Sequence, residues 1–266
     1  MASTFKWVNK QAVASAFSRA AGSYDALATV QREVGERLLG MGKDLPGVQL
    51  LDAGCGTGYF SRRWRTLGKQ VTALDLAPGL RAFARQQQAA DQYLLADIEQ
   101  VPLPSAPSAV MDICFSSLVV QWCSGAVVQW CSDLSVALTE LYRVTRPGVA
   151  ILFSTLAQGS LHELGDAWQQ VDGERHVNDF LPLAAIDAAC AGYRHCLEAQ
   201  WRTLNYPDVM ALMRSLKGIG ATHLRQGRES GLMSCRQFAA LQAAYPRLQG
   251  QFPLSYHLIY GVIYRN

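Results

Sequence analysis

The sequence lacks the features that mark membrane, secreted or zinc-stabilised proteins. None of its segments has 18 or more apolar residues without a charge, so we expect no membrane-spanning helix. Its seven cysteines are odd in number and form no C-x-x-C pair, which favours reduced thiols over disulfides or zinc. Residues 1–7 lack the apolar core and cleavage site of a signal peptide. These absences predict a cytoplasmic, globular protein without a bound metal.

Two phosphate-binding patterns are also missing from the most informative segment, residues 50–58 (LLDAGCGTG). A dinucleotide fingerprint requires G-x-G-x-x-G, but the sixth position counted from Gly54 is Tyr59. No Gly-Lys-Ser/Thr follows to make a P-loop. The segment is therefore not predicted to bind a pyrophosphate.

What is present is an acid, Asp52, at the end of an apolar strand, followed by Gly54, Gly56 and Gly58. Glycine allows positive φ and leaves no Cβ to block a ligand's approach to the backbone. A helix is predicted over residues 59–67, so the turn lies between a strand and a helix. Open α/β sheets bind nucleotides at such a turn. The alternative is a glycine turn that serves only the fold.

Two further predicted strands end near an acid. Residues 70–75 are apolar and β-branched and end in Asp75, near the roughly 20-residue spacing at which an acid binds ribose hydroxyls. Residues 93–98 contain Asp97, which is suited to an adenine amino group. An acid followed by alternate glycines resembles the first motif of class I S-adenosylmethionine-dependent methyltransferases, which implies S-adenosylmethionine as cofactor. The predicted cofactor-binding residues are Asp52, Gly54, Gly56, Gly58, Asp75, Leu76, Asp97, Ile98 and Ser116.

Strand and helix signals alternate from residue 48 to residue 154, which predicts an α/β fold with a doubly wound, mostly parallel sheet. The methyltransferase resemblance implies seven strands in the Rossmann-like arrangement. A turn at Gly22 and Ser23 is expected to divide the first helical region. We expect a single domain over residues 1–266, with a helical cap at about 8–40, a cofactor-binding core at about 45–155, and lid helices with the final strands at about 156–266.

The hexapeptide Val-Val-Gln-Trp-Cys-Ser occurs twice, at residues 119–124 and 127–132. Two copies are too few for a solenoid. The duplication predicts a lengthened loop between the fourth strand and the next helix, because loops tolerate insertion. The sequence does not decide whether Trp122 or Trp130 holds the original position.

Several segments resemble one family along nearly the whole chain, from about residue 8 to about residue 262. They are residues 17–25 (FSRAAGSYD), the Gln-Trp-Cys element, residues 159–164 (GSLHEL) and residues 214–221 (RSLKGIGA). The family is the malonyl-[acyl-carrier protein] O-methyltransferase of biotin synthesis. The resemblance implies methyl transfer to the free carboxylate of a malonyl thioester on acyl carrier protein, giving the ester that primes pimeloyl synthesis. The chain departs from the family in its duplicated element and in a short Arg146-Pro147-Gly148 turn.

This chemistry requires no general base. A carboxylic acid has a pKa of about 4, so the attacking carboxylate is already ionised at neutral pH. Catalysis would come from aligning the carboxylate oxygen with the methyl carbon and the sulfonium sulfur. The resemblance assigns Tyr24 a positioning role, because the family's Tyr-Asp pair closes over the cofactor. The alternative is a core tyrosine.

The last third of the chain is basic, with eight Lys or Arg and two acids after residue 200. An acidic partner such as acyl carrier protein would fit such a surface. Arg214 and Lys217 lie three residues apart on one predicted helix face, and Arg225 and Arg228 repeat the spacing. The alternative is a solvated face. Core packing is the alternative role for the two tryptophans, and a structural role is the alternative for the histidine. The predicted substrate- or carrier-binding residues are Trp122, Trp130, His176, Arg214, Lys217, Arg225 and Arg228.

Three rival functions remain open from the sequence. A methyltransferase for small quinone-like or sterol-like molecules would not require the basic face. A nucleic-acid methyltransferase could use that face, but no Asn-Pro-Pro-Tyr-like element is present, so we expect no nucleic-acid partner. A non-catalytic cofactor-binding module is the third, and the intact acids Asp52, Asp75 and Asp97 argue against it.

Overall fold

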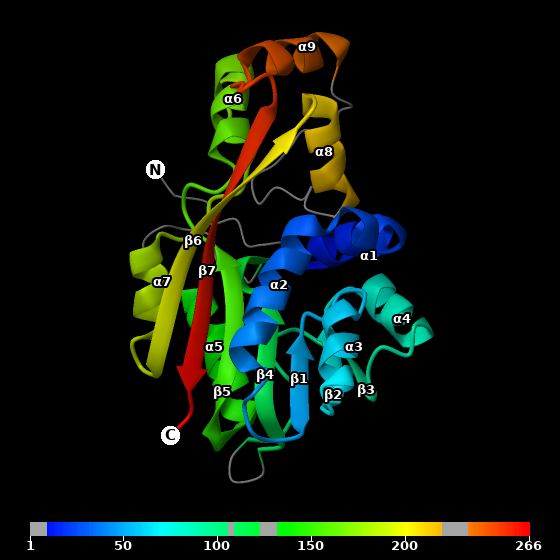
Figure 1. Ribbon diagram of the computed structural model, residues 1–266, viewed down its shortest axis with the longest axis vertical. Coiled ribbons are helices and arrows are strands. Elements are labelled where there is room, and N and C mark those ends of the chain that lie inside the picture. Colours follow the sequence, from blue (N-terminus) through cyan, green and yellow to red (C-terminus); the bar gives the residue numbers. More distant parts are fainter. Residues whose placement is uncertain (1–9, 106–108, 123–131, 220–233) are drawn as a thin grey trace, which may run out of the picture.

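The computed structural model describes residues 10–105, 109–122, 132–219 and 234–266, and a seven-stranded sheet forms its centre (Figure 1). The strand order is β3-β2-β1-β4-β5-β7-β6. Neighbours among β1 to β5 are parallel, whereas β7 is antiparallel to both β5 and β6. The mostly parallel, doubly wound sheet predicted from the sequence is thus confirmed. The strands are β1 (Gln49–Ala53), β2 (Gln70–Asp75), β3 (Gln92–Leu95), β4 (Met111–Ser117), β5 (Thr145–Leu156), β6 (Arg194–Tyr206) and β7 (Phe252–Tyr264).

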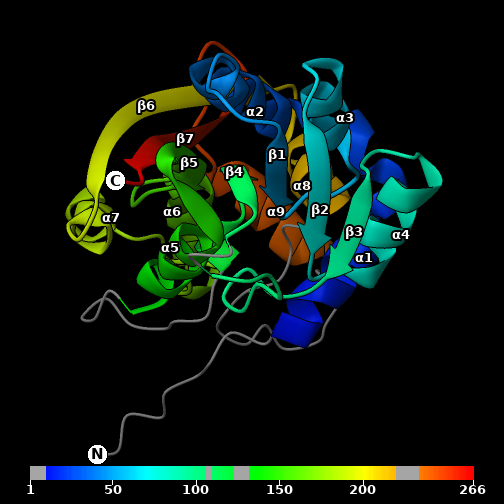
Figure 2. The same ribbon diagram turned by 90° about the horizontal axis from the view of Figure 1, so that it is seen from below.

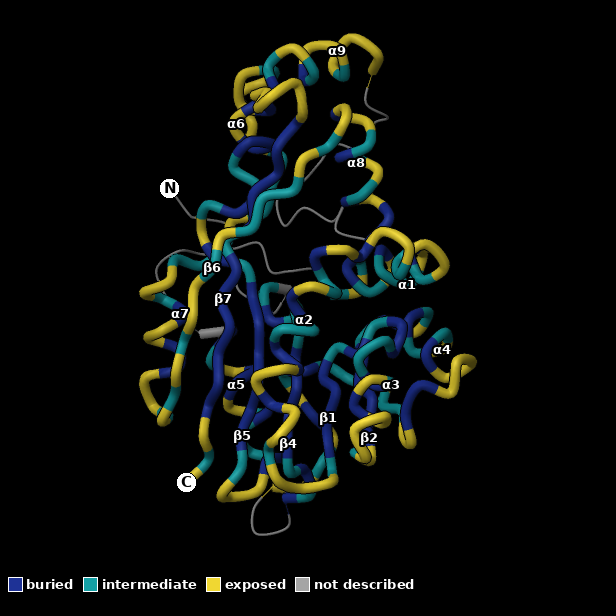
Figure 3. The backbone as a smooth tube through the Cα atoms, viewed as in Figure 1, coloured by how far each residue is buried: buried dark blue, intermediate teal, exposed yellow. Residues whose placement is uncertain are grey.

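Helices cover both faces of the sheet (Figure 2), and the central strands are buried (Figure 3). Successive side chains of a strand point to opposite faces. Leu50 accordingly belongs to one buried cluster with Trp64, and Leu51 to a second cluster with Leu138 and Ile186. The helices are α1 (Lys10–Leu27), α2 (Thr29–Gly42), α3 (Tyr59–Thr66), α4 (Pro78–Gln86), α5 (Ser132–Val144), α6 (His162–Asp172), α7 (Leu183–Cys190), α8 (Val209–Gly218) and α9 (Cys235–Ala244). Within the described parts of the chain, we find no helix with the length and hydropathy needed to span a bilayer.

The prediction of a turn at Gly22 and Ser23 is wrong. Helix α1 continues through both residues to Leu27, and the chain changes direction at Ala28, whose φ and ψ are −82° and 43°. An isolated glycine costs a helix only about 1 kcal/mol relative to alanine, which packing readily outweighs. Ser23 Oγ donates to the carbonyl of Ala20, three residues earlier, and so remains compatible with the helix.

Strands β6 and β7 continue beyond the rest of the sheet and carry α6, α8 and α9, which we name the distal layer (Figure 1). Strand β7 pairs with β6 along its full length but with β5 only from Leu258 onward. Glu163 of α6 is buried and accepts hydrogen bonds from the backbone N (3.0 Å) and Oγ (2.5 Å) of Ser255 in β7. The distal layer is therefore held on the strand extension. Its expected role as a lid, like the expected division of the domain, stays a prediction.

The distal layer also contacts α1. Ser23 Oγ donates to the carbonyl of Gly218 at the end of α8, at 3.1 Å. A Cβ on Gly218 would lie 2.0 Å from Cδ1 of Leu27, so a larger residue there would require the Leu27 side chain to move. Part of the segment 214–221, which carried the family resemblance, thus lies where the distal layer meets α1.

Candidate active site

The turn between β1 and α3 has the backbone conformation that its glycines predict. Gly54, Gly56 and Gly58 have φ values of 84°, 57° and 79°, in a region that residues with a Cβ rarely adopt. A Cβ on Gly54 would lie 2.2 Å from Cγ2 of Val119. A Cβ on Gly56 would meet no atom within 4 Å. The space beside Gly56 is therefore open to a ligand.

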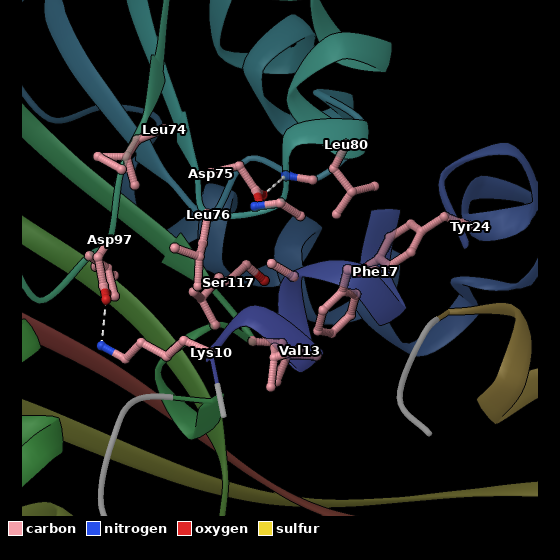
Figure 4. A pocket seen from close by; sticks show the side chains of 18 residues that line it. Lys10, Val13, Phe17, Tyr24, Leu74, Asp75, Leu76, Leu80, Asp97 and Ser117 are labelled. Atoms are coloured by element: carbon pink, nitrogen blue, oxygen red, sulfur yellow. Dashed lines mark hydrogen bonds and ion pairs between the residues drawn. The ribbon is translucent and has the colours of Figure 1, made fainter. Parts of the chain in front are cut away.

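Two cavities meet at this turn. The larger cavity, about 730 Å³ including its open mouth, lies between α1 and the ends of β2, β3 and β4 (Figure 4). The smaller cavity, about 460 Å³, lies between the α1–α2 junction and the start of α3. Tyr24, Gly54, Gly56 and Ser117 line both of them. The two cavities therefore adjoin each other along these four residues.

Asp75 ends β2 and lines the larger cavity. Its carboxylate accepts hydrogen bonds from the backbone N of Gly56 at 2.9 Å and of Ala77 at 2.7 Å (Figure 4). Burial raises the pKa of Asp75 to about 6, and the backbone hydrogen bonds oppose this shift. The group is thus ionised at neutral pH and joins the glycine turn to the neighbouring strand.

Asp97 lies in the same cavity and is paired with Lys10 at the start of α1 (Figure 4). The Lys10 ammonium also lies 2.6 Å from Oε2 of Glu99. Burial alone would lower the pKa of Lys10, but the two carboxylates raise it overall. This ion pair fastens the start of α1 beside the larger cavity. Leu76 and Ile98, the residues after the predicted acids, line the cavity as well.

Asp52 is the second-to-last residue of β1, two residues before Gly54, and lines the smaller cavity. It is 2% exposed, and Ser61 Oγ donates to its Oδ2 at 2.5 Å. Burial raises the pKa of Asp52 to about 7, although the hydrogen bond from Ser61 opposes the shift. Among the described residues, no group of three or more His, Cys, Asp or Glu side chains is placed to hold a metal ion.

Tyr24 lies between the two cavities, half-buried in α1. Burial raises the pKa of its hydroxyl, and the charges of Asp75 and Asp25 act in the same direction. Its ring therefore borders the site as a neutral aromatic group. Ser117 of β4 lines both cavities and Phe115 lines the smaller one, whereas the predicted Ser116 is fully buried and lines neither. Successive residues of a strand face opposite sides, so Ser116 faces away from the cavities that Ser117 lines.

Those predicted substrate-binding residues whose side chains the structure describes do not line either cavity. His176 Nε2 is 2.7 Å from Oδ2 of Asp172, and its ring lies 4.6 Å from that of Trp168, which favours the structural alternative. Arg214 and Lys217 are exposed on α8. Trp130, Arg225 and Arg228 lie outside the described residues, and only the backbone of Trp122 is described, at the end of a short 3₁₀ helix (Val120–Trp122).

Several residues of the first two helices line the cavities without having been predicted, among them Lys10, Phe17 and Arg32. A helix that packs over a site carries no local motif, so amphipathic spacing alone does not identify them. Asp25 is the exception, because it belongs to residues 17–25, one of the segments that carry the family resemblance. Asp25, beside Tyr24, accepts a 2.6 Å hydrogen bond from Thr57 Oγ1 in the glycine turn.

The fold and the site define the class of protein. A family model described as "Methyltransferase domain" matches residues 51–153. Two solved structures have the same fold: the YcgJ protein of Bacillus subtilis (TM-score 0.57, 13% identity, 87% of this chain and 99% of that one) and the [4+2]-cyclase SpnF (0.52, 17%, 88% and 80%). The chain has the Rossmann-like fold of class I methyltransferases.

Relatives identify one family within this class. The protein of Serratia marcescens is 75% identical over 266 residues, covering all of both chains. The protein of Yersinia pestis is 61% identical over 97% of this chain and 93% of its own. That of Salmonella typhimurium is 49% identical over 97% and 99%. All three are named malonyl-[acyl-carrier protein] O-methyltransferase, and the chain belongs to this family, which confirms the resemblance found in the sequence.

Proposed function

We propose that this chain transfers a methyl group from S-adenosylmethionine to the free carboxylate of malonyl-acyl carrier protein. The product is the malonyl methyl ester that primes pimeloyl synthesis for biotin. The observation that carries this proposal is a glycine turn beside acid-lined cavities, in a chain 75% identical to a malonyl-[acyl-carrier protein] O-methyltransferase. We expect the reaction to take place in the cytoplasm without a metal, a membrane or a nucleic acid.

The residues at the turn fit this cofactor. Asp75 would accept hydrogen bonds from the ribose hydroxyls, and Asp97 with Leu76 and Ile98 would surround the adenine. The open space beside Gly56 lets a ligand approach the backbone. Carboxylates on both cavities complement a positively charged ligand. When bound, the cofactor supplies an electrophilic methyl group on a sulfonium.

Tyr24 is the residue that we place beside the sulfonium. It lines both cavities, so its ring borders the region where the two ends of the cofactor would join. Because its pKa is raised, its hydroxyl stays protonated and cannot compete as an anionic methyl acceptor. Aromatic faces attract cations, by roughly 0.5–2 kcal/mol.

The acceptor carboxylate needs alignment more than activation. With a pKa of about 4, it is ionised at neutral pH. Holding two reactants in line lowers a barrier by roughly 7–11 kcal/mol. Val13 and Phe17 of α1 line the larger cavity and would exclude water from the reacting atoms. Their apolar surface also leaves the carboxylate weakly solvated, so that it remains reactive.

The carrier protein would dock on α8. Arg214 and Lys217 are exposed there, and α8 ends against α1, which borders the larger cavity. An acidic carrier on this helix would have its phosphopantetheine arm near the site. Arg225 and Arg228 would extend the basic surface, and Trp122, Trp130 and His176 remain predicted acceptor contacts.

A mass-spectrometric methyl-transfer assay tests the reaction. Purified protein and S-adenosylmethionine are mixed with malonyl-acyl carrier protein or malonyl-coenzyme A. We expect one methyl group to be added to the malonyl carrier protein and to be lost on ester hydrolysis. Bound cofactor without product on either thioester would contradict the carboxyl acceptor and favour a small-molecule substrate.

Charge reversal tests the docking face separately. The double variant Arg214→Glu/Lys217→Glu should raise the KM for the carrier substrate by roughly 10-fold or more, since it replaces two attractive contacts by repulsion. The KM for S-adenosylmethionine should hardly change. Lys43→Glu, exposed beyond the end of α2, is the matched control. Equal increases in both KM values would contradict docking at α8.

A further inference from the structure

The smaller cavity is lined by a cationic side chain that has no role in the proposed reaction as described above. Among the described residues that line it, Arg32 alone carries a permanent positive charge. Arg32 lies in the first turn of α2, and its guanidinium carbon is 5.7 Å from the centre of the Tyr59 ring. This contact places a guanidinium against an aromatic wall of the cavity.

The Arg32 side chain has no anion of its own within the described protein. Its Nε is buried without a hydrogen-bond partner. The two acids of α2 are already paired with other arginines, Glu33 with Arg202 and Glu36 with Arg63. Leaving a buried donor unsatisfied costs free energy, and more for a charged group. An anionic ligand in the smaller cavity would give the Arg32 guanidinium a counter-ion.

The acids of the same cavity are held apart from Arg32 by their own donors. Asp25 accepts a hydrogen bond from Thr57, and Asp52 accepts one from Ser61. No ion pair within 4.0 Å joins either of them to Arg32 in the described structure. The cavity thus presents one cation and separate carboxylates, which is the pattern that a zwitterion requires.

We propose that Arg32 binds the α-carboxylate of the methionine part of the cofactor, while Asp52 faces its ammonium group. This inference rests on the proposed use of S-adenosylmethionine. With adenosine in the larger cavity beside Asp75, the amino-acid part passes Gly54 and Gly56 into the smaller one. A guanidinium presents several donors in a plane that match a carboxylate. Arg32 therefore determines specificity for the amino-acid end.

Calorimetry with two ligands tests this assignment. S-adenosylhomocysteine carries the carboxylate, and 5′-methylthioadenosine lacks the whole amino-acid part. Arg32→Gln should weaken S-adenosylhomocysteine binding by roughly 10- to 100-fold, the range for a hydrogen-bonded charge. It should leave 5′-methylthioadenosine affinity within about 2-fold. Arg32→Lys should recover part of the loss, since it retains the charge.

Arg81→Gln is the matched control, because Arg81 also has a buried Nε without a partner but lines neither cavity. Equal weakening of both ligands by Arg32→Gln, or no weakening of either, would overturn the assignment. If that variant does not fold, wild-type protein still provides the test with decarboxylated S-adenosylhomocysteine, which must bind at least about 10-fold more weakly than the parent ligand. Failure of wild-type protein to bind S-adenosylhomocysteine would instead overturn the proposed cofactor.

Discussion

The two cavities that meet at the glycine turn are built in different ways. The larger one is bordered by residues at or just after the carboxyl ends of β2 and β3, such as Asp75 and Asp97, and by α1. The smaller one is bordered by helical residues around the α1–α2 junction and the start of α3, such as Gln31 and Arg32, together with the glycine turn and the ends of β1 and β4. Strand ends of one sheet edge meet by topology, whereas a helix reaches the site only through tertiary packing.

Because of this difference, the two parts of the proposed cofactor would contact different elements of the fold. The strand-end acids would hold the nucleoside, a part common to many ligands of open α/β sheets. The helices, together with Asp52 of β1, would hold the amino-acid part, and α1 would cover the acceptor. Helix α1 contributes to both, since Lys10 lies at the larger cavity and Tyr24 between the two. The following substitutions are expected to affect the two cavities unequally.

The largest effect should come from Asp75→Ala. It removes the acceptor for the ribose hydroxyls and also leaves the backbone N–H groups of Gly56 and Ala77 without their partner. We expect affinity for both S-adenosylhomocysteine and 5′-methylthioadenosine to fall by roughly 100-fold, because each charge-assisted hydrogen bond contributes about 1.5–3 kcal/mol. Calorimetry that gave unchanged affinity would remove Asp75 from the cofactor site.

Cofactor affinity should depend on pH through the two raised carboxyl pKa values. Asp52, with a pKa of about 7, must be ionised to attract the ammonium, and Asp75 titrates at about 6. Protonation removes the negative charge, so affinity for S-adenosylhomocysteine should fall by about 10-fold from about pH 8 to about pH 6.

The pH dependence also distinguishes the cavities. Binding of 5′-methylthioadenosine, which has no ammonium, should weaken only near the pKa of Asp75, about 6. Asp52→Asn should remove the component near pH 7 for S-adenosylhomocysteine. If both ligands showed the same profile, the ammonium would not face Asp52.

A smaller effect is expected from Lys10→Met. The substitution keeps the apolar stem but removes the charge that holds α1 to Asp97 and Glu99. Release of S-adenosylhomocysteine, followed by stopped-flow fluorescence, should become about 2- to 5-fold faster, as partly exposed ion pairs contribute only about 0.2–1 kcal/mol. Release from the wild type should accelerate with salt, while release from the variant should not. Unchanged release would show that the ion pair does not retain the ligand.

The smallest effect, and one of opposite sign, concerns Gly22 within α1. A Cβ there would meet no atom within 4 Å. Gly22→Ala should therefore raise the free energy of unfolding by about 0.5–1 kcal/mol in chemical denaturation. Gly218→Ala is the contrasting variant, because its Cβ would collide with Leu27. Destabilisation by Gly22→Ala would indicate a turn there after all.

The part of the candidate site at the strand ends could be predicted from the sequence, and the part on the helices could not, for physical reasons. Asp75 and Asp97 follow apolar, strand-like segments, and parallel strand order then places both at one edge. The sequence predicts Ser116, whereas Ser117 lines the cavities, because strand alternation is sensitive to a single residue. Arg32 lies on a helix whose contacts depend on tertiary packing, so its sequence carries no sign of a site.

The fold shows the same division. The alternating strand and helix segments up to β5 are sufficient to predict the parallel pairing of β1 to β5. The course of α1 through Gly22 depends on packing that local propensity does not record. Helix α8 packs against α1 at the close approach of Gly218 to Leu27. Only the tertiary structure shows this contact.

A crystal structure with S-adenosylhomocysteine tests the central claim most directly, namely that one ligand spans both cavities. The account predicts ribose hydroxyls on Asp75, adenine beside Asp97 and Ile98, and the α-carboxylate on Arg32. Adenosine in the larger cavity, with the amino-acid part directed away from Arg32 and the smaller cavity left unused, would contradict it.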